Sequence, residues 1–86
     1  MSYAVSLAGS ARRDLSKIPP RAASACVEFI YGPLKANPQR VGKPLRSDLE
    51  RLHSARRGDY RVLYRILPGQ ILIVRVDHRA SAYRPL

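Results

Sequence analysis

The order of patterns along the 86-residue chain predicts an α+β domain. In it, two N-terminal helices pack on one face of a twisted, mainly antiparallel sheet of four strands. Three observations support this prediction. A short alternating segment comes first, two helical segments follow, and three strand-like segments joined by tight turns come last. No repeat or linker interrupts this order, so we expect one domain over residues 1–86.

The first segments of the chain predict one strand and a short helix. Residues 3–7 (YAVSL) alternate loosely between apolar and polar side chains, which is typical of a strand. Ser10 precedes a helical segment over residues 11–17, and its hydroxyl is of the type that caps the first turn of a helix. We therefore expect Ser10 to cap this helix.

A second helix is predicted to begin at Pro20, because proline is well tolerated at the first helical position. Apolar residues recur at helical spacing and form one face of it: Ala23, Cys26, Val27, Ile30 and Leu34. Gly32-Pro33 is expected to kink or end this helix, and Asn37-Pro38 is expected to end it.

The second half of the chain predicts a loop and then a three-stranded meander. Residues 38–50 contain two prolines and a glycine, so we interpret them as an ordered loop. Strands are expected over residues 52–57, 60–67 and 70–79, separated by two tight turns that each contain a glycine. Consecutive strands joined in this way pair antiparallel.

The charge balance indicates a polyanionic partner. Sixteen Lys and Arg residues face six Asp and Glu residues, which gives a net charge of +10. Such an excess repels itself in a small fold, and an anion relieves the repulsion. Thirteen of the sixteen are arginine, whose guanidinium forks onto phosphate and stacks on bases, so nucleic acid is favoured over other anions.

Other features bound the class of protein. The apolar share of 45% argues against a disordered chain. Cys26 is the only cysteine and lies on the apolar helical face, so we expect a core residue, no internal disulfide and a reducing cytoplasmic location. Neither a signal peptide nor a membrane-spanning segment is expected. Two histidines and scattered carboxylates do not suggest a metal site, and no cofactor motif is present.

Alternation along the strands predicts a positively charged open face. Tyr60, Val62, Tyr64 and Ile66 should share the face that meets the helices. In the last strand we expect the clean apolar set to point the same way: Leu72, Val74 and Val76. Five arginines would then line the opposite, open face: Arg56, Arg61, Arg65, Arg75 and Arg79. Strands about 4.8 Å apart would hold these charges close together.

Two segments carry a family resemblance. The run GKPLRSDLERLHSARRGDYRVLYRI, followed later by VDHRASAYR, resembles the RelE toxins of bacterial toxin–antitoxin pairs. The resemblance implies a fold like that of small microbial ribonucleases. It also implies a metal-independent enzyme that enters the A site of the 70S ribosome and cuts messenger RNA. There the 2′-hydroxyl attacks the adjacent phosphate, and a RelB-like antitoxin with an acidic segment blocks the toxin.

The resemblance also implies roles for individual residues. Arg56, Arg61, Arg79 and Tyr83 correspond to catalytic positions of the family. We add His78 because histidine titrates near neutrality and this one adjoins Arg79. Further residues are expected to bind RNA: Lys43, Arg46, Ser54, Arg57, Arg65 and Arg75.

The identity of the general base stays open. Family members often carry basic residues where this chain has Ser54 and Leu52. Arginine holds charge on a phosphorane well but is a poor base, since its pKa exceeds about 12. The remaining candidates for proton transfer are Tyr83, His78, His53 and Lys43.

Two other functions compete with the ribonuclease. Toxins of the related ParE branch share the fold and poison DNA gyrase by binding, without cutting RNA. A basic module that binds nucleic acid without chemistry is the third hypothesis. The arginines that correspond to catalytic positions, together with Tyr83, favour the nuclease. The absence of the family's usual lysine at positions 54 and 52 weakens this hypothesis.

Overall fold

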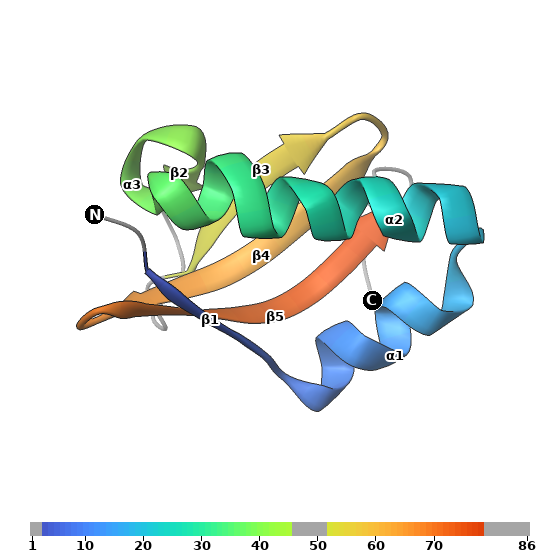
Figure 1. Cartoon of the computed structure of the whole chain (residues 1–86), viewed down its shortest axis with the longest axis horizontal. Coiled ribbons are helices and arrows are strands. Elements are labelled where there is room, and N and C mark those ends of the chain that lie inside the picture. Colours follow the sequence, from blue (N-terminus) through green and yellow to red (C-terminus); the bar gives the residue numbers. More distant parts are fainter. Residues whose placement is uncertain (1–2, 46–51, 79–86) are drawn as a thin grey trace.

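The molecule is built around a mixed sheet, and the computed structural model describes residues 3–45 and 52–78 of it (Figure 1). The strand order is β1-β5-β4-β3-β2, with β1 parallel to β5 and every other neighbouring pair antiparallel. The strands are β1 (Ala4–Leu7), β2 (Lys43–Pro44), β3 (His53–Arg57), β4 (Tyr60–Leu67) and β5 (Gln70–His78). The predicted α+β class is confirmed, but the sheet has five strands and not four.

The additional strand arises within the predicted loop. The segment begins with a short helix, α3 (Pro38–Val41), and then forms β2, which pairs with β3 at the edge of the sheet. A two-residue strand is too short to produce alternation in the sequence. Proline is also tolerated at an edge, where its missing N–H breaks no central ladder.

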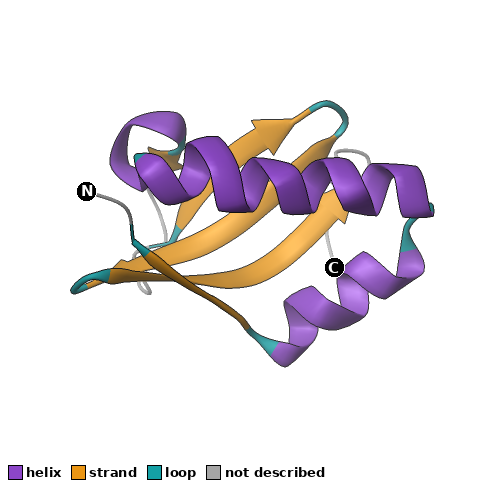
Figure 2. Ribbon diagram, viewed as in Figure 1, coloured by secondary structure: helices purple, strands orange, loops and turns teal. Residues whose placement is uncertain are grey.

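The helices α1 (Gly9–Lys17) and α2 (Pro20–Phe29) pack against the sheet (Figure 2). The prediction that Ser10 caps α1 is wrong: Ala8 stands at the cap position, and the Ser10 hydroxyl donates to the carbonyl of Val74 at 2.6 Å. The Asp14 carboxylate accepts from the N–H of Val76 at 2.9 Å. Helix α1 therefore satisfies backbone groups of β5 beyond the end of β1.

The second helix continues past Gly32-Pro33 as a π-helix, η1 (Ile30–Leu34). Proline removes one hydrogen bond of the helical ladder, and the wider π-turn accommodates that loss within the helix. The helical run ends at Asn37, as predicted, and Pro38 opens α3. In the described part of the chain, no helix is long and apolar enough to cross a membrane.

The core lies between α2–η1 and the centre of the sheet. Val62 and Tyr64 of β4 are fully buried, as expected. The prediction for β5 is wrong for its first half, because a register shift places Leu63 opposite Arg75 and Tyr64 opposite Ile73. A bulge of this kind inverts the alternation. The residues of β5 that enter the core are therefore Ile71, Ile73 and Val76.

Candidate active site

The β3–β4 hairpin brings two arginines directly opposite each other. Its turn is tight, and Gly58 adopts a φ of +62°, a backbone conformation that glycine favours. Arg56 and Arg61 are cross-strand partners in this hairpin. The Cβ atoms of such partners lie about 5 Å apart on one face of the sheet. Like charges at this spacing destabilise the free protein and attract an anion.

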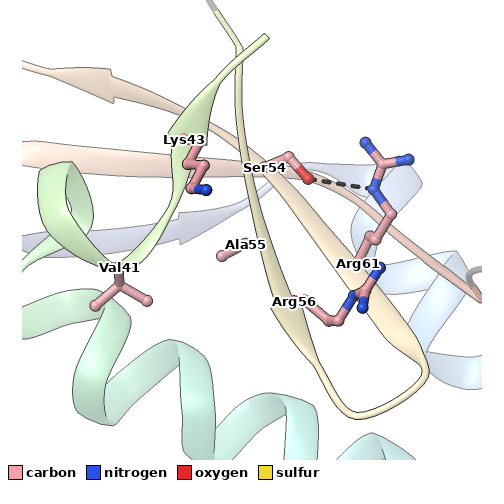
Figure 3. A pocket seen from close by; sticks show the side chains of 6 residues that line it. All are labelled: Val41, Lys43, Ser54, Ala55, Arg56 and Arg61. Atoms are coloured by element: carbon pink, nitrogen blue, oxygen red, sulfur yellow. Dashed lines mark hydrogen bonds between the residues drawn. The ribbon is translucent and has the colours of Figure 1, made fainter.

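A hollow of about 420 Å³ lies beside this arginine pair (Figure 3). This size falls within the range of small-ligand sites. We call it the basic hollow, and the residues that line it are Val41, Lys43, Ser54, Ala55, Arg56 and Arg61. Three of the six are basic, so the hollow suits an anionic group such as phosphate.

Ser54 orients one of the arginines. The Nε of Arg61 donates to the Ser54 hydroxyl at 3.2 Å (Figure 3). This bond spans β3 and β4 and restrains the plane of the guanidinium. Ser54 is also the cross-strand partner of Lys43 on β2. The residue predicted to bind RNA therefore also holds Arg61 in place.

Residues 38–44, which form α3 and β2 at one corner of the sheet, are attached to the core by Tyr64. The Tyr64 hydroxyl donates to the carbonyl of Pro38 at 2.6 Å and is hydrogen-bonded to the backbone of Gly42. A Cβ at Gly42 would lie 2.0 Å from the Tyr64 oxygen, so this approach requires glycine. Burial raises the pKa of Tyr64 to about 12, against the smaller lowering effect of the Gly42 bond. The phenol therefore stays protonated and keeps donating at neutral pH.

Three residues that the sequence predicted for the site lie on the helix-facing side of the sheet, away from the basic hollow. They are His53, Arg57 and His78. Arg57 is the cross-strand partner of Tyr60, which in turn lies opposite His78. The rings of Tyr60 and His78 meet edge to face at 5.2 Å. His53 stacks on Tyr64 with ring centroids 5.5 Å apart. The structure thus separates both histidines from the Arg56–Arg61 pair.

Arg57 acts instead on the helix-facing side. Burial raises the pKa of the Cys26 thiol, and the charge of Arg57 lowers it by a smaller amount, so the net shift is upward. Cys26 is 1% exposed and belongs to the core, as its place in the helical pattern predicted.

Two more predicted RNA-binding arginines lie on the open face. Arg75 bonds the carboxylate of Asp14 at 2.8 Å and that of Asp77 at 3.2 Å. The hydrogen bond with Asp14, aided by the charge of Asp77, raises the pKa of Arg75. Its guanidinium therefore joins α1 to β5. Arg65 lies opposite Leu72 and is exposed to solvent.

The remaining predicted residues, Arg46, Arg79 and Tyr83, lie outside the described residues. Sequence reasoning missed the contribution of Val41 to the hollow and the attachment made by Tyr64 and Gly42. The glycine in the GKP run was the one available signal for that close approach.

Fold and site together define a small α+β protein that presents an arginine hairpin suited to phosphate. Residues 5–83 match the model of the family described as ParE toxin of type II toxin-antitoxin system, parDE. The chain therefore belongs to this family, and within its superfamily it is a toxin of the RelE type.

Two curated relatives from Mycobacterium tuberculosis are similar over nearly the whole chain. Toxin RelE is 54% identical over 84 residues, which cover 95% of this chain and 87% of that protein. Toxin RelG is 55% identical over 86 residues, which cover 98% of this chain and 99% of that protein.

Solved structures agree with the described fold. The toxin–antitoxin complex RelBE2 from Mycobacterium tuberculosis matches with a TM-score of 0.87 and 54% identity, over 93% of this chain and 94% of that chain. The archaeal RelE–RelB complex from Pyrococcus horikoshii matches with a TM-score of 0.73 and 26% identity, over 92% of this chain and 97% of that chain.

Proposed function

We propose that this toxin is an endoribonuclease that cuts messenger RNA in the A site of the ribosome. The observation that carries the proposal is the Arg56–Arg61 pair beside the basic hollow. In the proposed reaction the 2′-hydroxyl of the substrate attacks the adjacent phosphate. The bond from phosphorus to the 5′-oxygen then breaks. The 2′-hydroxyl loses one proton and the 5′-oxygen gains one, so a 2′,3′-cyclic phosphate and a free 5′-hydroxyl result.

The arginine pair suits the charge that develops in this reaction. The phosphorane carries more negative charge than the phosphodiester from which it forms. Two guanidinium groups with permanent charge would stabilise the additional negative charge of the phosphorane. Because they would stabilise the transition state more than the bound substrate, the reaction would be faster. The nucleophile belongs to the RNA itself, and the arginines supply positive charge at the phosphate, so we propose a step without a metal ion or a cofactor.

The partners follow from the same surface. Solved relatives include RelBE2 and RelE–RelB complexes of toxin with antitoxin. We propose that a cognate antitoxin binds this chain through an acidic segment, which would compete with RNA for the same cations. Because its substrate would be translated messenger RNA, we place the protein in the cytoplasm.

Mapping of 5′ ends tests the proposal. Ribosomes programmed with messenger RNA are incubated with the purified chain, and new 5′ ends are mapped. Cuts at a fixed offset from the A site are expected. DNA damage and filamentation in expressing cells, with no such cuts, would instead identify a gyrase poison of the ParE kind. RNA binding without cuts or DNA damage would identify a module without chemistry.

Arg61→Ala provides the matched variant. We expect cleavage to fall by about 100-fold or more, because one donor to the developing charge is lost. The fold should persist, since Arg61 lies on the open face and outside the core. Circular dichroism and thermal unfolding check this. A folded Arg61→Ala protein that still cuts at the wild-type rate would exclude Arg61 from the reaction.

A further inference from the structure

We propose that Lys43 is a catalytic residue, which reaches the reacting phosphate from the edge strand β2 and joins Arg56 and Arg61 as a third fixed cation. This inference rests on the proposed ribonuclease function and assigns one more residue to its site. The inference depends on the fold, which places Lys43 beside the β3–β4 hairpin. In the sequence Lys43 precedes the hairpin and belongs to a separate strand.

The pairing of β2 with β3 positions Lys43. Its cross-strand partner is Ser54, so both side chains leave the same face of the sheet. Ser54 is short and accepts a hydrogen bond from Arg61, and it brings no charge of its own. The ammonium of Lys43 supplies positive charge beside this position, and Figure 3 shows the lysine next to Ser54 at the basic hollow.

The backbone on either side of Lys43 is anchored, although the side chain is exposed. On one side, Gly42 lies against the Tyr64 hydroxyl, which also bonds Pro38. On the other side, the N–H of Leu45 donates to the carbonyl of Leu52 at 2.9 Å. A lysine on an anchored strand loses less entropy on binding than one on a mobile loop, so its charge is better preorganised.

Among the described residues, neither a histidine nor another lysine lies at the hollow. His53 and His78 lie on the helix-facing side of the sheet. The other two lysines are distant in the fold: Lys17 ends α1, and the carbonyl of Lys35 accepts from Tyr3 near the start of β1. Lys43 is therefore the lysine placed to act with the arginine pair.

We assign Lys43 an electrostatic role. Its ammonium would contact a non-bridging oxygen and stabilise the phosphorane, with no proton transferred. This role predicts that the cleavage rate depends on the positive charge of the side chain at position 43 and not on its ability to take up a proton. Arginine keeps the charge but cannot act as a base, so Lys43→Arg separates the two. Lys43→Met removes the charge and keeps an unbranched side chain.

The test measures single-turnover cleavage on programmed ribosomes at saturating toxin. We expect Lys43→Met to slow the cleavage step by about 100-fold, as the loss of one preorganised donor does elsewhere. Lys43→Arg should stay within about tenfold of the wild type. The matched control is Lys17→Met, which removes the same charge from an exposed position at the end of α1 and should leave the rate unchanged.

Three outcomes would overturn the inference. Lys43→Met that cuts at the wild-type rate would remove Lys43 from the reaction. Lys43→Arg as slow as Lys43→Met would replace the electrostatic role with proton transfer. An equal loss of cleavage rate in Lys17→Met would show that the effect of Lys43→Met comes from the net charge of the protein and not from the position of Lys43. The proposed function fails differently, because a wild-type chain that cuts nothing defeats it whatever the variants do.

Discussion

The hydroxyl of Tyr64 joins the centre of the sheet to the corner that carries Lys43. The ring is fully buried in the core, while its oxygen lies between Pro38 and Gly42. One residue therefore contributes both to stability and to the position of β2. In the role proposed for Lys43, Tyr64 is therefore a positioning residue, because it holds the backbone next to Lys43.

Tyr64→Phe is expected to destabilise the protein by about 1–3 kcal/mol, because the buried carbonyl of Pro38 loses its donor. The loss should depend on pH. Burial raises the pKa of Tyr64 to about 12 in the folded chain, against about 10 when unfolded. Its contribution is therefore fully present below about pH 10 and is lost as the pH rises through about 12.

Chemical denaturation of both proteins checks this expectation. The difference in unfolding free energy between wild type and Tyr64→Phe should shrink between about pH 8 and about pH 11. Comparison of the two proteins cancels the titration of the other tyrosines. A difference that stays constant over this interval would contradict the assigned pKa shift.

At the scale of elements, α1 is held to β5 by polar contacts. Asp14 accepts from the N–H of Val76 and from the Nε of Arg75, and Ser10 donates to Val74. These bonds satisfy the edge of β5 where β1 no longer pairs with it. An open edge would otherwise expose unpaired backbone groups to other chains.

Asp14→Ala is expected to cost about 1–3 kcal/mol of unfolding free energy, because Val76 and Arg75 both lose an acceptor. Thermal or chemical unfolding measures it. Asp59→Ala is the control, since Asp59 is an exposed carboxylate in the hairpin turn. Equal stability of the two variants would show that the contacts of Asp14 contribute nothing to folding.

At the scale of the whole molecule, the net charge of +10 favours association with a polyanion. Phosphate contacts release counterions, so the affinity for RNA should fall at least tenfold between about 50 and about 200 mM salt. Arg61→Ala should reduce the slope of log affinity against log salt by about one, if Arg61 contacts a phosphate. Equilibrium titration at several salt concentrations measures both, and a flat dependence would exclude phosphate contacts as the source of affinity.

The sequence alone determined the features that depend on local pattern. The hairpin followed from a glycine turn between two alternating runs, and strand parity then placed Arg56 and Arg61 on one face. Parity also buried Val62 and Tyr64. The toxin family followed from the run that ends in GDYRVLYRI and from the later run VDHRASAYR. These inferences needed only neighbouring residues, because turn type and alternation are properties of short segments.

The tertiary structure alone decided what depends on distant contacts. Because of the bulge in β5, Ile73 and not Val74 points into the core. Asp14 binds Arg75, although the two residues are 61 positions apart in the sequence. The pairing of β2 with β3 brought Lys43 opposite Ser54. No local pattern encodes such events, because register and edge pairing are set by how the helices and the sheet pack together.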